Sequence, residues 1–120
     1  MKYKIKIQSN RSFNLPRVIK DEIKSKGFDK AEWIIDNNNK IVKLNFLKDI
    51  ETPLDKTEDD IMKFYRNIYR FSMIKIPNII YNYLNCEIFD NIILDIDEND
   101  VVVTSSKKER ISELSALIKE

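Results

Sequence analysis

The chain has 120 residues, of which 42% are hydrophobic, enough for one domain with a buried core. Its single cysteine, Cys86, excludes an internal disulfide, and with no histidine and no second cysteine a zinc site is close to excluded. No run of about 18 apolar residues occurs, and the charged N-terminus lacks the apolar centre of a signal peptide. We therefore expect a cytoplasmic protein without a membrane partner.

The net charge of +1 is unevenly distributed along the chain. Residues 1–50 hold 12 basic and 6 acidic residues, a net +6, whereas residues 51–120 hold 9 and 14, a net −5. Between Lys63 and Asp100 every cation precedes Pro77 and every acid follows it. A basic surface is typical of nucleic-acid binding, but basic residues on a strand are often only a solvated face that discourages edge pairing. Charge alone leaves both interpretations open.

The first segment alternates apolar and basic side chains over its first eight residues, which predicts a strand with one buried face. A polar turn and a second, short strand follow, and Pro16 ends that strand because proline cannot donate to a sheet ladder. Proline at the first helical position then predicts a helix whose buried side is Val18, Ile19 and Ile23. Gly27, the only glycine, is placed to end this helix in the left-handed conformation.

A β-hairpin is predicted over residues 31–46. Apolar and polar residues alternate on both sides of Asn37-Asn38-Asn39, and asparagine tolerates the positive φ angles of a tight turn. Residues 48–61 have weak periodicity, a proline and several acids, so we interpret them as a linker.

The same pattern returns after a shift of about 61 positions, which indicates an internal repeat. The aligned pairs are Leu15-Pro16 with Ile76-Pro77, Phe28-Asp29 with Phe89-Asp90, and Ile35-Asp36 with Ile96-Asp97. Residues 1–47 form the first repeat and residues 62–104 the second. The repeat favours a strand over a helix for the ambiguous stretch that opens the second copy.

The second predicted helix has Ile79, Ile80, Tyr83 and Leu84 as its inner face. Its exit must differ from that of the first helix, because Ile88 stands in the place of Gly27 and a β-branched residue is strained at positive φ.

Residues 105–120 have no counterpart in the first repeat. A serine cap and a stripe of Ile111, Leu114, Leu117 and Ile118 predict an amphipathic helix. This helix either covers the sheet or serves for association, with a second copy of the chain or with another protein.

This order of elements resembles the AbrB/SpoVT swapped-hairpin family of DNA-binding proteins. The resemblance is carried by FNLPRVIKDEI, GFD and AEWIIDNNNKIVKL, and again by IKIPNIIYNYL, IFD and IILDIDENDVVV. It implies a mainly β fold with short helices, in which the hairpins of two units interlace into one AbrB-like β-barrel, followed here by the C-terminal helix. Members of the family bind DNA as dimers through basic residues on their front strands and loops, so two units in one chain imply a covalent pseudo-dimer.

The resemblance and the cations ahead of each proline together predict a transcription regulator that binds double-stranded DNA. Cations would contact phosphates, and Asn14 or Arg17 would reach base edges. The predicted interface is Lys4, Lys6, Arg11, Asn14, Arg17, Lys20, Arg66, Arg70 and Lys75. Arg11 stands one place further from Pro16 than the family arginine, and Ser72 replaces it in the second copy. The prediction therefore depends on the basic face more than on one arginine, and the first copy should dominate.

The main alternative is an antitoxin-like or other interaction module whose acidic second half and C-terminal helix bind a partner protein. Catalysis is not expected, because the chain has no histidine, no glycine-rich phosphate loop, and no serine or cysteine beside a plausible base. We expect neither a metal nor a cofactor. The abundance of isoleucine, asparagine and lysine is typical of an AT-rich genome, archaeal or viral, which for a virus would place the protein in the host cytoplasm.

Overall fold

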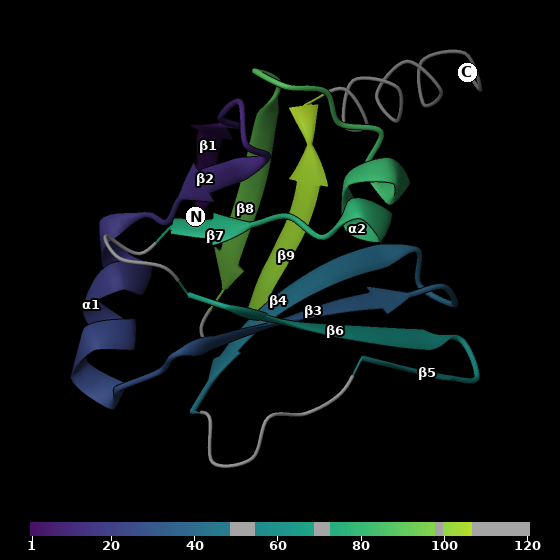
Figure 1. The fold of residues 1–120 in the computed structure, drawn as a ribbon, viewed down its shortest axis with the longest axis horizontal. Coiled ribbons are helices and arrows are strands. Elements are labelled where there is room, and N and C mark those ends of the chain that lie inside the picture. Colours follow the sequence, from purple (N-terminus) through teal and green to yellow (C-terminus); the bar gives the residue numbers. More distant parts are fainter. Residues whose placement is uncertain (49–54, 69–72, 98–99, 107–120) are drawn as a thin grey trace.

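A computed structural model describes residues 1–48, 55–68, 73–97 and 100–106. These residues form a mainly β fold with a seven-stranded antiparallel sheet, a two-stranded sheet and two short helices (Figure 1). In chain order the elements are β1 (Lys2–Lys6), β2 (Ser12–Asn14), α1 (Arg17–Lys26), β3 (Lys30–Asp36), β4 (Ile41–Leu47), β5 (Lys56–Glu58), β6 (Ile61–Asn67), β7 (Met73–Lys75), α2 (Asn78–Tyr83), β8 (Asn91–Asp97) and β9 (Asp100–Ser105). The predicted mainly β class with short helices is confirmed.

Strands of the first half, residues 1–48, pair with strands of the second half, residues 61–106. The large sheet has the order β1-β8-β9-β4-β3-β6-β5, so β1 pairs with β8 and β6 pairs with β3. Tyr3 lies opposite Leu94, and Phe64 lies opposite Trp33. The two registers coincide under the shift of about 61 positions found in the sequence. Each opening strand is therefore completed by the hairpin of the other half.

Two further ladders join the halves. Phe13 lies opposite Ile74 in the β2–β7 sheet, and Lys43 lies opposite Val102 between β4 and β9. Figure 1 shows β2 and β7 running across the direction of β8 and β9. Within the described residues β1 and β5 end the large sheet and no ladder joins them, so continuous hydrogen bonding around a barrel is not observed.

One core is shared by both halves. Trp33, Phe13 and Leu94 are all 0% exposed and belong to β3, β2 and β8. The ring of Phe13 meets the indole of Trp33 edge-on, with centroids 6.2 Å apart and planes at 77°. This contact fastens the small sheet to the large one. The buried indole N–H of Trp33 has no hydrogen-bond partner among the described residues.

The helices differ from prediction in which residues they bury. Ile19 and Ile23 of α1 are buried as expected, but Val18 is 51% exposed and Ile79 of α2 is 46% exposed, so their assignment to the inner faces was wrong. Residues four apart share one line along a helix, whereas a neighbour is turned by about 100°. In α1 only the line of Ile19 and Ile23 is buried, whereas α2 buries the neighbours Ile80 and Tyr81 and leaves Ile79 in solvent.

The first helix begins at Arg17, one residue later than predicted, with Pro16 as its N-cap. Gly27 ends it at φ 68°, as predicted. The exit of α2 does differ: after six residues the chain turns through positive φ at Asn85 (55°) and Phe89 (71°), and Cys86 is buried beside this turn. No described helix is long and apolar enough to span a membrane.

The hairpins differ in their loops. Asp36 pairs with Ile41 around four loop residues, and Asp97 pairs with Asp100 around two. In the longer loop Asp36 accepts hydrogen bonds from the side chain and backbone of Asn39, which hold the pKa of its carboxyl below its usual value.

The stretch predicted as a linker contributes β5, which pairs with β6. The opening of the second copy is a strand, β6, as the repeat predicted. The predicted C-terminal helix lies outside the described residues beyond position 106.

Candidate nucleic-acid interface

The lysines of β1 lie at one end of the large sheet. Lys4 and Lys6 are exposed and lie opposite Ile93 and Asn91 of β8. The ammonium group of Lys6 is 5.5 Å from the centre of the Phe89 ring. Neither lysine has an ion-pair partner among the described residues, so both charges face solvent.

Arg11 has a structural role that the amino-acid sequence did not indicate. It lies at φ 61° in a tight turn, and its carbonyl oxygen accepts the N–H of Ile76 at 2.9 Å. Its Nη1 donates to Oδ1 of Asn78, and its guanidinium lies 5.0 Å from the centre of the Tyr81 ring. Burial raises the pKa of Tyr81, and this outweighs the charge of Arg11, which lowers it. Arg11 thus holds a turn of the first half on α2 of the second.

The remaining first-half residues lie around the start of α1. Asn14 and Arg17 are exposed, and Lys20 is half-buried. Under the repeat shift they correspond to Lys75, Asn78 and Tyr81, the last two of which hold Arg11. The same helix positions therefore carry free cations in the first half and an arginine-binding surface in the second.

Two predicted cations of the second half line one notch. A cavity of about 220 Å³ is lined by Arg66, Lys75, Ile76, Pro77 and Asn78. Lys75 also borders a second cavity of about 260 Å³, together with Asn10, Ser12 and Met73. The structure thus brings Arg66 and Lys75 together with Asn78, the acceptor of Arg11.

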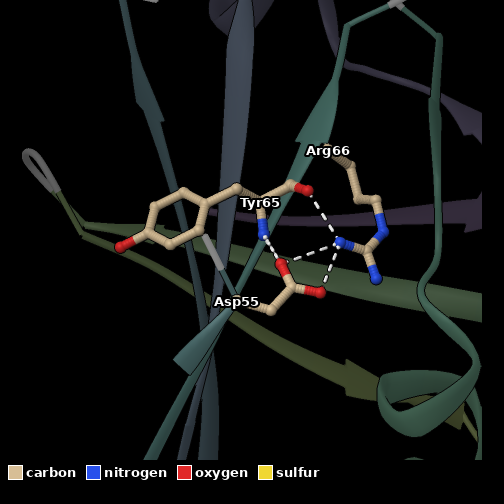
Figure 2. Close-up of polar contacts among 3 residues, drawn as sticks. All are labelled: Asp55, Tyr65 and Arg66. Atoms are coloured by element: carbon tan, nitrogen blue, oxygen red, sulfur yellow. Dashed lines mark hydrogen bonds and ion pairs between the residues drawn. The ribbon is translucent and has the colours of Figure 1, made fainter. Parts of the chain in front are cut away.

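The charge of Arg66 is partly neutralised. Its Nη1 lies 3.0 Å from Oδ2 of Asp55, and Figure 2 shows the carboxylate held between the guanidinium and the backbone N–H of Tyr65. Sequence reasoning missed Asp55 because it lies in the predicted linker, and missed Asn78 and Tyr81 because no local pattern marks them. Arg70 lies outside the described residues.

The predicted residues form two groups. Lys4 and Lys6 belong to the β1 end of the sheet, whereas Arg11, Arg66 and Lys75 surround the β2–β7 ladder and α2. No hydrogen bond or ring contact between described residues joins the two groups.

The outer face of the sheet carries a separate polar row. Glu32 of β3 lies opposite Tyr65 of β6, and Asn45 of β4 donates to Glu32 at 3.3 Å. Burial, and then the hydrogen bond to Glu32, raise the pKa of Tyr65 to about 12. This row leaves Tyr65 protonated and bound to Glu32.

In the described ranges no group of three or more metal-ligating side chains comes together. Neither protein-family models nor curated proteins give a match to this chain.

Proposed function

We propose that the chain binds duplex DNA as a covalent pair of swapped-hairpin units that complete one AbrB-like barrel, and that it regulates transcription. The observation that carries this proposal is the reciprocal pairing of β1 with β8 and of β6 with β3 in matching registers. Independent repeats would pair each opening strand with the hairpin of its own half. The exchanged pairing supports the arrangement that the family resemblance implies.

The predicted cations that have no ion-pair partner within the described part of the chain support the choice of ligand. In the first half these are Lys4, Lys6, Arg17 and Lys20, and in the second half Lys75. Phosphate contacts from such residues position a protein on a duplex, while Asn14, exposed on β2, would reach a base edge. About five phosphate contacts predict that log K falls with log salt at a slope of about −4 to −5.

Fluorescence anisotropy with a random-sequence duplex over a range of salt concentrations tests the proposal. Replacing Lys4, Lys6 and Arg17 by alanine should weaken binding about tenfold or more and reduce the slope by about 0.9 per lost contact. The matched control replaces Lys40, Lys43 and Lys56, which changes the net charge equally on the β3–β4 hairpin and β5. Circular dichroism excludes loss of fold. Absent binding at low salt, or equal losses in both triple variants, would contradict the proposed interface.

A second candidate is the antitoxin-like interaction module. It is favoured by an apolar groove of about 290 Å³ beside α1, whose walls include Val18, Phe28, Phe46 and Ile96. The contacts that Arg11 and Arg66 make within the chain also favour it, because they leave less of both positive charges available to DNA. A stoichiometric partner captured from the native host by the wild type, but not by Val18→Asp, would support this candidate.

A further inference from the structure

We propose that the notch lined by Arg66, Lys75 and Asn78 binds one phosphate group, and that the carboxylate of Asp55 is a built-in counter-ion that weakens this binding. The inference deepens the proposed DNA binding, on which it rests for its biological ligand. The notch itself is tested separately with inorganic phosphate.

Arg66 is held by one edge only. Its Nη1 donates to both carboxylate oxygens of Asp55 at 3.0 Å and to the carbonyl oxygen of Tyr65 at 2.7 Å. A guanidinium has five N–H donors, and the three on Nε and Nη2 have no acceptor among the described residues. In Figure 2 no dashed line joins the second terminal nitrogen of Arg66 to Asp55. The free edge has the geometry with which arginine binds a phosphate through two parallel hydrogen bonds.

The other polar side chains of the notch are also donors. Lys75 is exposed at the end of β7 and supplies an ammonium group. The Oδ1 of Asn78 accepts the hydrogen bond of Arg11, so its amide N–H groups remain available to the notch. The notch therefore offers two cations and an amide to an anion, and Asp55 beside Arg66 is the opposing charge.

Asp55 offsets one of these two positive charges. Its carboxylate is anchored by the backbone N–H of Tyr65 at 2.9 Å, so it stays beside Arg66 instead of moving freely in solvent. Replacement by asparagine keeps an oxygen for that N–H and removes only the charge. The affinity of the notch for phosphate should then rise, because Arg66 and Lys75 act without an opposing carboxylate.

Titration with inorganic phosphate, followed by the NMR signal of the Arg66 side-chain Nε–H, tests the notch without DNA. We expect Asp55→Asn to bind phosphate at least threefold more tightly than the wild type. The signal is assigned by its loss in Arg66→Gln. The double variant Asp55→Asn with Arg66→Gln, followed by the backbone shifts around Lys75, should bind phosphate no more tightly than the wild type. Asp59→Asn is the matched control, because it removes an exposed acid at a positive φ that asparagine tolerates. Equal phosphate affinity in Asp55→Asn and wild type would overturn the inference.

The same variants are then measured with random-sequence duplex. Asp55→Asn should bind several-fold more tightly, with a salt slope steeper by up to about 0.9, and only while Arg66 is present. If Asp55→Asn changes neither duplex binding nor phosphate affinity, the notch is not a phosphate site, and the proposed DNA binding still stands. If Asp55→Asn binds phosphate more tightly but no variant binds duplex, the notch is a phosphate site and the proposed DNA binding is contradicted.

Discussion

The two halves of the molecule share their strand pairing but not their surfaces. Trp33 opposite Phe64 corresponds in register to Leu94 opposite Tyr3. On the outside, α1 has ten residues and ends at a left-handed glycine, whereas α2 has six and ends without one. The buried pairing therefore tolerates different helix lengths, loops and helix ends around it.

Charge follows the same rule. Among the described residues of the predicted interface, the first half carries its unpaired cations on β1 and α1, while the second half uses the corresponding helix positions, Asn78 and Tyr81, to hold Arg11. Its own Arg66 is paired with Asp55. One half is thus arranged to present charge, and the other to bind and moderate it.

The largest effect is expected when one half is removed, because each half pairs with the other. Residues 1–50 alone lose β8 beside β1, β6 beside β3 and β9 beside β4, which exposes the Trp33 and Leu44 side chains. We expect no folded monomer by circular dichroism and analytical ultracentrifugation. Adding residues 51–120 as a separate chain should restore β structure. A folded monomeric half would show that the halves do not depend on each other.

Equivalent core positions give the next largest effect. Trp33→Ala should lower the free energy of unfolding by about 3–5 kcal/mol, and Leu94→Ala by about 2–5 kcal/mol, because both side chains are fully buried. Both variants should unfold in one transition in denaturant, since the core is common. Lys24→Ala, at an exposed site, is the control. Two separate transitions, each moved by only one variant, would contradict a shared core.

The helix ends provide a smaller test. Gly27→Ala should cost about 1 kcal/mol, because alanine is strained at φ 68°. A Cβ atom there would meet only Cε of Lys48 at 3.8 Å, so steric overlap does not contribute. In the second half Asn85→Gly should change stability by less than about 0.5 kcal/mol, because asparagine already tolerates this region. Equal changes in the free energy of unfolding at the two sites, measured by chemical unfolding, would contradict a difference between the ends of α1 and α2.

The last comparison concerns pH. The pKa of Tyr65 is raised to about 12 in the folded chain, above its value of about 10 in the unfolded chain. Its contribution to stability is therefore complete below about pH 10 and is lost as pH rises toward 12. Its counterpart in the first half, Lys4 opposite Ile93, has no such hydrogen bond. The stability of the wild type relative to Tyr65→Phe should decline over this range, and parallel curves would refute the role of the phenol.

Much of the fold could be predicted because strands with one buried face leave a period of two in the sequence. Alternation located the hairpin of residues 31–46, and the repeat resolved the opening of β6, which local pattern left ambiguous. The short charged strand β5 has no such alternation, and with it Asp55 escaped notice. The exposure of Val18 depended on how narrowly α1 packs, which the apolar pattern of the helix does not determine.

The site was less predictable than the fold. Positive charges were found correctly as residues, but their partners are far away in the chain. Arg11 and Asn78 are 67 positions apart, and Arg66 and Asp55 are 11 apart across a turn. Whether a cation is free or engaged is a property of such contacts, and a local pattern contains no information on it.

The pairing of Lys2 with Asp95 has a consequence for the order of folding. β1 leaves the ribosome well before β8, so its part of the large sheet is closed by contacts of high sequence separation, which slow folding. During that delay β1 is an unpaired edge with an apolar face. Lysine at every second position of β1 hinders its association with other nascent strands. The same three charges, Lys2, Lys4 and Lys6, would thus protect the chain before they serve any ligand.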